Sequence, residues 1–353
     1  MEKIIFECET ITPMFCYGAD QKTPEVRAAS IKGALRFWWR AINGHLSINE
    51  LRKKETDIFG GSGFSYKDDN GKKIEVPARK SKITVRINQQ NIEEADFKSI
   101  KMETTKVKYG QKEVNVNIDK YLGLGMFKMG KNPSHKFIKP ESKFQIIIKF
   151  PEQKKIDILN SFLCLDFIGN IGAKSRNGFG SIKLSNIQEF HEYSNFEDFI
   201  KYLSKKNTEL PKYFAFSNKV KIFRGNNASS WEAALSQIGK AYIQSRITID
   251  GPHNFEKRKY IAFPINARNE KIDHFLDEKD SRKPKPYFFK IIKSKNEYCP
   301  YIFYFPSEYA FGITSIKKYK NIDESKHTKL FLEACNSLNN QICKQGFEEI
   351  IYE

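Results

Sequence analysis

Near its middle the chain reads Gly169-Asn-Ile-Gly172-Ala-Lys-Ser-Arg176-Asn-Gly178-Phe-Gly180, with four glycines around a Lys-Ser-Arg centre. Glycine reaches backbone conformations that other residues avoid, and it lets a second backbone approach closely. Exposed backbone N–H groups beside lysine and arginine side chains form a cradle for anions. This stretch therefore predicts a loop that can follow a polyphosphate backbone.

The segments on either side of the glycine loop exclude one common use of such loops. An apolar helical run, residues 156–167, precedes the loop, and an alternating strand, residues 181–184, follows it. The phosphate-binding loop of an ATPase instead follows a strand, opens a helix and ends in Gly-Lys-Ser or Gly-Lys-Thr. Nucleotide hydrolysis is therefore not expected.

Length and composition favour two domains and a polyanionic partner. The chain has 353 residues, a formal net charge of +18 and a pI near 9.4, so nucleic acid is the first candidate and an anionic membrane surface the second. No apolar run is long enough to span a membrane. The six cysteines are scattered without a CxxC pair, which predicts free thiols in a reducing cytoplasm, no metal site and no cofactor.

The order of the expected elements gives the fold class. Both halves read as strand, helix, strand, strand, helix, strand, which predicts an α+β protein with two ferredoxin-like (RRM-like, βαββαβ) domains and long insertions. The first half uses residues 3–8, 30–42, 82–87, 144–150, 156–167 and 181–184; the second uses 214–223, 230–247, 287–292, 301–305, 329–343 and 347–352. A polar stretch before Pro211 separates the expected domains, residues 1–204 and 212–353.

Two insertions carry much of the positive charge. Residues 88–142 include a lysine-rich part, 101–140, which reads either as a solvated hairpin or as an arm along a nucleic-acid backbone. Residues 279–295 form a second basic stretch, with Lys285 and Lys290 among its cations. Within the first insertion we expect apolar side chains to touch a partner subunit; these are Leu122, Leu124, Met126 and Phe127.

The helix expected at residues 30–42 has two distinct sides. Ile31, Leu35, Trp38 and Ile42 form an apolar stripe that predicts core packing. A second side carries the cations Lys32, Arg36 and Arg40, which read either as a solvated surface or as a phosphate-binding face. Ser30 and Gly33 favour the second reading, because free N–H groups at a helix start attract phosphate and glycine leaves room for it.

Two histidines keep an enzymatic alternative open. A metal-independent endoribonuclease would need a histidine beside the scissile 2′-hydroxyl. His45 follows the basic helix and His135 lies in the lysine-rich insertion. The helical wheel puts His45 on the apolar side, which favours a packed histidine over a catalytic one.

Five motifs in the first half together resemble a known family. They are Ile11-Thr-Pro13-Met-Phe, Glu25-Val-Arg27, Ser30-Ile-Lys-Gly33-Ala-Leu-Arg36-Phe-Trp-Trp39-Arg40, Ile58-Phe-Gly60-Gly-Ser62 and Gly172-Ala-Lys-Ser-Arg176-Asn-Gly178-Phe-Gly180-Ser. Over residues 1–185 the chain resembles the RAMP superfamily of CRISPR RNA-binding proteins. Within that superfamily it is most similar to the first subunits of type III-B, or Cmr, effector complexes.

The resemblance implies a non-catalytic RNA-binding subunit of an antiviral ribonucleoprotein. Such a subunit contacts the 3′ part of the guide RNA or the guide–target duplex, together with neighbouring RAMP subunits, and its partners are guide RNA and target RNA rather than a membrane. A stand-alone RAMP-type endoribonuclease that processes guide precursors is the alternative. The RNA-binding residues implied by the matching motifs are Arg27, Ser30, Lys32, Gly33, Arg36, Arg40, Gly172, Lys174, Ser175, Arg176, Gly178 and Gly180. Asn177 stands where many relatives carry a basic residue.

Overall fold

The computed structural model describes residues 1–68, 70–109, 112–126, 135–190, 193, 196–251, 254–265, 274–276 and 282–352. Over these residues the chain combines α-helices with antiparallel sheets, so the expectation of a mixed α and β fold is confirmed.

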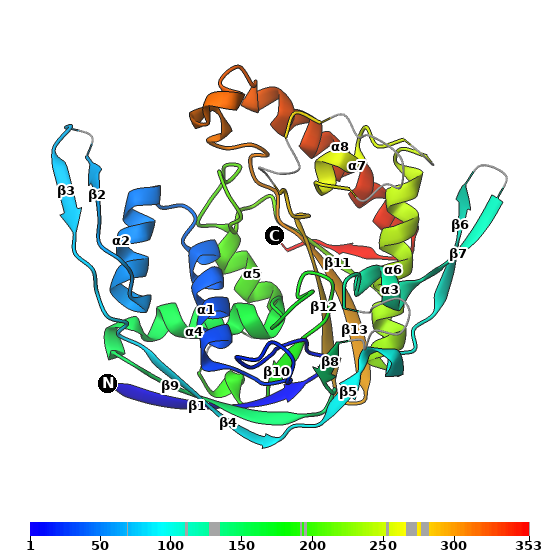
Figure 1. Ribbon diagram of the computed structural model, residues 1–353, viewed down its shortest axis with the longest axis horizontal. Coiled ribbons are helices and arrows are strands. Elements are labelled where there is room, and N and C mark those ends of the chain that lie inside the picture. The colour runs from blue at the N-terminus through cyan, green and yellow to red at the C-terminus, as the bar shows by residue number, and fades with distance from the viewer. Residues whose placement is uncertain are drawn as a thin grey trace.

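The N-terminal half forms a four-stranded antiparallel sheet in the spatial order β10-β1-β9-β4. Helices α1 and α4 lie together on one face of this sheet (Figure 1). In chain order the elements are β1 (Glu2–Thr10), α1 (Ala28–Ile42), β4 (Thr84–Asn91), β9 (Lys143–Phe150), α4 (Lys155–Phe167) and β10 (Ile182–Leu184). The first strand therefore lies inside the sheet, between the third and the fourth.

Alternating apolar residues explain how the sheet and the helices meet. In β1 the side chains of Ile4, Phe6 and Cys8 are buried, whereas those between them are partly or fully exposed. Successive side chains of a strand point to opposite faces, so the buried set faces the helices. The predicted apolar stripe of α1 is confirmed as core, and Trp39 is buried beside it.

The C-terminal half builds a second four-stranded antiparallel sheet, in the order β12-β13-β11-β14. Its elements are β11 (Lys221–Arg224), α6 (Trp231–Thr248), β12 (Tyr287–Ser294), β13 (Glu297–Tyr304), α8 (Glu324–Lys344) and β14 (Glu348–Ile350). Counted along the chain, its strands are second, third, first and fourth, which is the order of the N-terminal sheet read from the other edge.

The C-terminal sheet is buried on both faces. From β12, Tyr287 and Phe289 pack in a core that contains residues of α6 and α8. Phe288, between them, packs in the core of the N-terminal half, as do Tyr301 and Phe303 of β13. One face of this sheet therefore packs on the core that contains α1 and α4.

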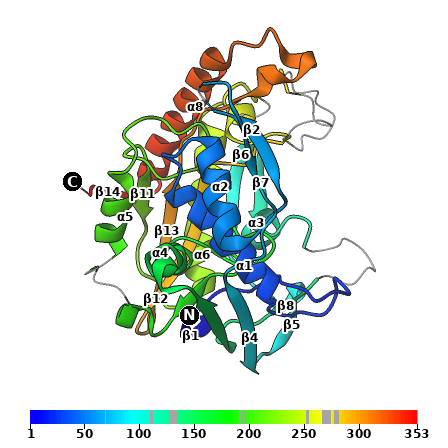
Figure 2. The same cartoon turned by 90° about the vertical axis from the view of Figure 1, so that its left-hand side faces the viewer.

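Further elements surround the two sheets. They are α2 (Ile48–Phe59), β2 (Phe64–Lys67), β3 (Lys73–Val76), β5 (Glu94–Asp96), β6 (Thr104–Tyr109), β7 (Lys112–Asn117), α3 (Ile118–Leu122), β8 (Lys136–Ile138), α5 (Phe196–Ser204), α7 (Arg258–Ile261) and five short 3-10 turns, η1 (Phe97–Ser99), η2 (Glu152–Lys154), η3 (Ile187–Phe190), η4 (Ile313–Ser315) and η5 (Lys317–Tyr319). The hairpins β2–β3 and β6–β7 project on opposite sides of the molecule (Figure 1). Seen from the N-terminal half, α1 and α2 lie above the strands β1 and β4 (Figure 2).

One expected strand is mostly wrong. The prediction of a strand over residues 214–223 holds only for the part inside β11. The preceding aromatic residues lie outside any strand and pack through their side chains and backbone: the Phe214 ring stacks on Phe37 of α1 at 4.9 Å and lies 5.0 Å from the Phe288 ring of β12, and the Phe216 N–H donates to the Ala41 carbonyl at 3.0 Å. Tertiary contacts with α1 thus override the high β-propensity of this segment.

The long insertion packs against the C-terminal half over its described residues. Ile118 and Leu122 of α3 are buried in the core that contains α6. Gly239 of α6 admits this contact, because a Cβ there would overlap the side chain of Ile118. Arg246 of α6 also donates to the Tyr121 hydroxyl at 2.7 Å. Of the two readings of this insertion, the arm along a nucleic-acid backbone is therefore wrong for α3; residues 127–134 lie outside the described residues.

Candidate nucleic-acid interface

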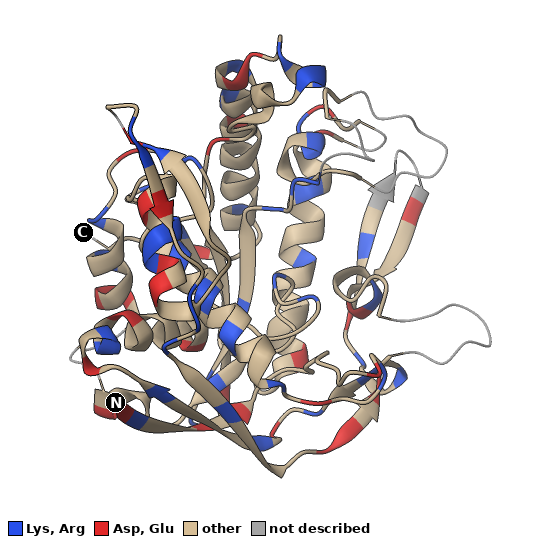
Figure 3. Cartoon of the chain, turned by 60° about the vertical axis from the view of Figure 1, so that its left-hand side comes forward, with Lys and Arg blue, Asp and Glu red and all other residues tan. Residues whose placement is uncertain are grey.

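Lysine and arginine residues occur on elements of both halves (Figure 3). The outer side of α1 is the first candidate. Arg27, which precedes the helix, is exposed, and so is Gly33, where a Cβ would meet no atom within 4 Å. Burial lowers the pKa of Lys32, and the neighbouring Arg36 lowers it further. This surface therefore combines positive charge with room for a ligand to approach the backbone.

Two of the predicted cations of α1 are already paired within the protein. Arg36 Nε and Arg40 Nη1 both bond to Glu55 Oε1 of α2, the second at 3.1 Å. The two arginine side chains remain 38% and 43% exposed, whereas that of Glu55 is 8% exposed. The carboxylate fixes both guanidinium groups and neutralises one of their two charges, and this role of Glu55 was not predicted from the sequence.

The expectation of free backbone N–H groups at Ser30 and Gly33 is wrong. The Ser30 N–H donates to the Arg27 carbonyl at 3.0 Å. Gly33 lies beyond the first turn of α1, and only first-turn N–H groups lack a partner within a helix. What Gly33 contributes is an exposed helix surface without a side chain.

The backbone of the glycine loop is shaped by contact with an N-terminal segment. Gly172 has a φ of +92°, and a Cβ there would lie 2.5 Å from the Phe15 carbonyl oxygen. The next residue, Ala173, donates its N–H to that oxygen at 2.8 Å. Gly172 is therefore required for close backbone packing, while its other side is exposed.

The prediction that Gly178 and Gly180 contact RNA does not fit their burial. Both residues are buried. A Cβ on Gly178 would lie 2.5 Å from Leu235 Cδ1 of α6, and one on Gly180 would overlap the backbone carbonyl of Ile171. These two glycines let the loop close and pack on the C-terminal half.

The centre of the loop carries its cations. Lys174 adopts a left-handed φ of +59°, and partial burial lowers the pKa of its ammonium. Arg176 is held more firmly: Nη1 donates to the Lys285 carbonyl at 2.6 Å, and the guanidinium lies 4.5 Å from the centre of the Phe288 ring. Burial lowers the pKa of Arg176 to about 10, so its charge persists at neutral pH.

Helix α1 and the glycine loop meet at one cavity of about 250 Å³. Ser30, Ala34 and Phe37 line it from α1, at spacings that place them on one side of a helix. From the loop it is lined by Gly172, Ser175 and Arg176. Two segments separated by more than a hundred residues therefore contribute to one site.

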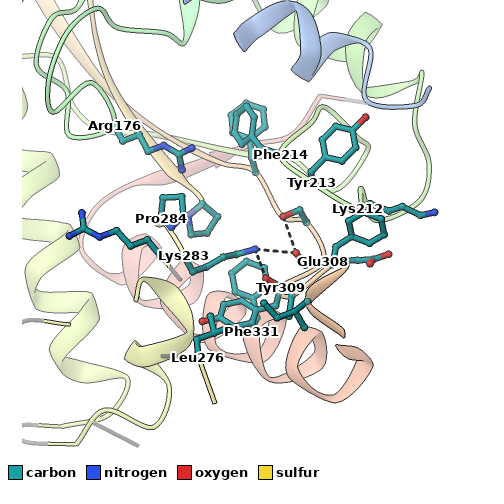
Figure 4. Close-up of a pocket in the computed structure, with 17 residues that line it drawn as sticks. Arg176, Lys212, Tyr213, Phe214, Leu276, Lys283, Pro284, Glu308, Tyr309 and Phe331 are labelled. Carbon is teal, nitrogen blue, oxygen red and sulfur yellow. Dashed lines mark hydrogen bonds between the residues drawn. The ribbon is translucent and has the colours of Figure 1, made fainter. Parts of the chain in front are cut away.

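Arg176 also lines a second, larger cavity of about 490 Å³ (Figure 4). Cations at this cavity include Lys212, Arg282 and Lys283. Lys283 Nζ donates to the carbonyls of Glu308 and Tyr309 at 3.1 and 2.6 Å, and burial lowers its pKa to about 8. The rings that line the cavity are Tyr213, Phe214, Pro284, Pro286, Phe305, Tyr309, Phe311 and Phe331.

A third cavity, of about 590 Å³, links this aromatic cavity to the arginines of α1. It is lined by Arg36, Arg40 and Arg52 and shares Tyr213 and Phe311 with the aromatic cavity. We use the name basic cleft for the three adjoining cavities. The contribution of residues 212–214 was not predicted, because the sequence pattern places Phe214 in a strand.

The cations of the second basic stretch, residues 279–295, lie in different environments. Arg282 and Lys283 reach the basic cleft. Lys290 is fully buried, and the Lys285 ammonium is buried 3.2 Å from the centre of the Phe289 ring. The cations of this stretch therefore do not all lie on one surface. Lys279 lies outside the described residues.

The apolar residues expected to touch a partner subunit differ in their exposure. Leu122 is buried against α6, so that prediction is wrong for it. Leu124 is 55% exposed, and the expectation stands for it. Met126 is partly buried against the same core, and Phe127 lies outside the described residues.

Within the described part of the chain, neither histidine of the enzymatic alternative hydrogen-bonds to a carboxylate that would prepare it for acid–base chemistry. His45 is exposed, contrary to the expectation that it packs, and its pKa is lowered by partial burial and then by Lys206 and Lys54. The His135 ring lies 5.8 Å from that of Tyr17. Among the described residues, no group of three or more His, Cys, Asp or Glu side chains could hold a metal ion. No helix in the same part of the chain could cross a membrane.

The chain belongs to the RAMP superfamily, whose family model matches residues 7–183. The resemblance noted in the sequence is thereby confirmed. Two curated relatives come from Pyrococcus furiosus. The CRISPR system Cmr subunit Cmr1-1 is 25% identical over 320 residues, 82% of either chain, and Cmr1-2 is 26% identical over 202 residues, 54% of this chain and 98% of the relative.

Solved structures share the fold. The crystal structure of Cmr1 from Pyrococcus furiosus in its apo form aligns with a TM-score of 0.53 at 20% identity, over 87% of this chain and 88% of that one. A chain in the cryo-EM structure of type III-B Cmr-beta bound to cognate target RNA aligns with a TM-score of 0.50 at 15% identity, over 96% of this chain and all of that one.

Proposed function

We propose that the chain is a non-catalytic RNA-binding subunit of a type III-B CRISPR (Cmr) effector complex in antiviral defence. Its RAMP family membership and its similarity to Cmr1 subunits support this function. Its partners are guide RNA, target RNA and other RAMP subunits, in the cytoplasm. It contacts the 3′ part of the guide RNA or the guide–target duplex.

One observation carries the placement of the RNA: α1 and the glycine loop line the same cavity. A ribose-phosphate strand carries one charge per nucleotide, and cations along its path hold it by releasing counterions. Lys32 of α1 and Lys174 of the loop are partly exposed cations on the two elements that meet there. Contacts of this kind position an RNA strand, whereas its base sequence is recognised by guide–target pairing.

The aromatic part of the basic cleft suits an unpaired nucleotide. Unstacked RNA bases bind by stacking on aromatic rings or on arginine planes. Tyr213 and Phe214 line the same cavity as the cations Lys212 and Lys283 (Figure 4). A base between the rings with its phosphate near a cation fits this lining.

We also propose that the chain consists of two ferredoxin-like domains. The strand order of the two sheets and the element order strand, helix, strand, strand, helix, strand support two ferredoxin-like domains. Their proposed bounds are residues 1–204 and 212–353. The two core clusters do not coincide with these bounds: Ile11, Phe15 and Phe179 of the first half pack in the core that contains α6 and α8, and β11, β12 and β13 contribute to both clusters.

Titration with a single-stranded RNA oligonucleotide at several salt concentrations tests the proposed function. Lys32→Ala combined with Lys174→Ala should weaken binding and reduce the slope of log K against log salt by about 1.4, or about 0.7 for each lost phosphate contact. Lys326→Ala with Lys329→Ala on α8 removes the same charge from exposed positions and is the matched control. Equal slopes for the two double variants would refute the placement of the RNA, and RNA cleavage by the purified chain would refute the non-catalytic role.

A further inference from the structure

Lys290 is a buried lysine of β12 that reaches into the N-terminal half. Its exposure is 0%, and Nζ donates to the carbonyls of Gly169 at 2.7 Å, Ile182 at 3.2 Å and Leu165 at 3.3 Å. An ammonium group has three N–H donors. All three therefore have a partner, and every partner belongs to the other half of the chain.

These three carbonyls mark the end of α4 and both ends of the glycine loop. Leu165 belongs to the last turn of α4, where carbonyls lack partners within the helix and a cation is favoured by the helix dipole. Gly169 begins the loop, and Ile182 is the first residue of the strand that follows it. One ammonium group thus caps α4 and ties the two ends of the loop together.

A carboxylate balances the buried charge. Burial lowers the pKa of Lys290 to about 7, and the opposing effect of Asp166 of α4 keeps it from falling further. The Asp166 carboxylate also accepts the Leu184 N–H at 2.6 Å, so it is held at the same junction. Burying a charge is costly unless the charge has a countercharge and full hydrogen bonding. Lys290 has both.

The loop also runs along the edge of β12 on either side of Lys290. The Phe289 N–H donates to the Arg176 carbonyl at 3.3 Å, and Asn170 Nδ2 donates to the Phe289 carbonyl at 2.7 Å. The Ile291 N–H donates to Ser181 Oγ at 3.4 Å. The loop is therefore attached to the C-terminal sheet along its length, with Lys290 at the centre of the attachment.

We infer that Lys290 is a positioning residue for the glycine loop: by closing the loop and fixing it on β12, it sets where Lys174, Ser175 and Arg176 stand relative to α1. Its relevance to RNA rests on the proposed function. The effect on loop geometry depends on the contacts of Lys290 and not on that function. An interior lysine thus controls a surface that it does not reach.

Two measurements on Lys290→Met test the inference. Hydrogen exchange reports loop closure at the amides of Ile171, Ala173 and Asn177, which bond to carbonyls of Gly180, Phe15 and Lys174. We expect these amides to exchange at least about tenfold faster, while amides of β1 and β9 keep their rates. Affinity for a single-stranded RNA oligonucleotide should fall about tenfold, or about 1.4 kcal/mol.

Two further variants separate positioning from general stability. Lys293→Met removes a lysine of the same strand that pairs with Glu9 at 2.7 Å, and it should leave the loop amides and the affinity unchanged. Lys290→Gln retains two N–H donors and should restore part of the loop protection.

Each outcome decides the inference. Unchanged loop exchange in Lys290→Met overturns it. So does faster exchange spread equally over β1, β9 and the loop, or a failure of both Lys290 variants to fold, because Lys290 would then hold the whole fold. A wild-type chain that binds no RNA refutes the proposed function instead, and the exchange arm still decides the role of Lys290.

Discussion

Replacing Gly33 with alanine separates RNA binding from stability, because the two should change in opposite directions. Gly33 is the sixth residue of the 15-residue helix α1, and it is exposed with no atom within 4 Å of an added Cβ. The methyl group therefore neither clashes nor packs. Only the difference in helix propensity remains, and alanine is favoured over glycine by about 1 kcal/mol within a helix.

That gain should appear as a modest rise in thermal stability. The entropy of unfolding is about 2.1 cal/mol/K per residue, or about 0.7 kcal/mol/K for a chain of this length. A gain of about 1 kcal/mol then raises Tm by about 1.5 °C, which calorimetry resolves.

RNA affinity should fall in the same variant. If a phosphate approaches the backbone of α1 at Gly33, the added carbon displaces it. A loss of about 1 kcal/mol corresponds to about a fivefold weaker Kd. A variant that is both more stable and equally tight in RNA binding would show that no strand passes over Gly33, and the reasoning about this face of α1 would be refuted.

Three further predictions follow from the contacts of the site. Gly180→Ala combines a φ of +75° with overlap on the Ile171 carbonyl, so urea unfolding should show a loss of about 2–4 kcal/mol; unchanged stability would contradict the packing described. Glu55→Gln frees Arg36 and Arg40 from their shared carboxylate, so RNA binding should tighten at low salt with a salt slope steeper by about 0.7, and an unaltered slope would show that neither arginine reaches RNA. Burial lowers the pKa of Lys283 from 10.5 to about 8, so the folded protein releases this proton at a lower pH than the unfolded chain, and the free energy of unfolding should rise between about pH 8 and 10.5. RNA affinity should fall as the pH passes from 7 to 9, because the cation loses its charge, and this fall should be smaller in Lys283→Met.

The elements that were predicted well are those whose pattern is local. The apolar stripe of α1 and the alternation of β1 report burial directly, since each residue's neighbours in sequence are also its neighbours in space. Helix α2 was missed although Ser47 and Glu50 form a capping box, which is readable from their spacing. That signal could have found the helix and, with it, Glu55.

The site was harder to predict because distant residues decide it. Lys290 and Gly169 are 121 positions apart, and nothing in the sequence around Lys290 distinguishes a buried lysine from an exposed one. Gly178 and Gly180 look like parts of an anion cradle, yet contacts with Leu235 and Ile171 explain them as packing glycines. Basic and glycine-rich patterns predict where a site lies better than they predict which residues face the ligand.

The central claim is that α1 and the glycine loop hold one RNA strand between them. Ultraviolet cross-linking of the chain to a single-stranded RNA oligonucleotide, followed by mass spectrometry of the cross-linked peptides, tests it directly. We predict cross-links within residues 27–40 and within residues 170–177, both lost in Lys32→Ala/Lys174→Ala. Cross-links confined to other elements, such as α8 or the hairpin β6–β7, would contradict the account.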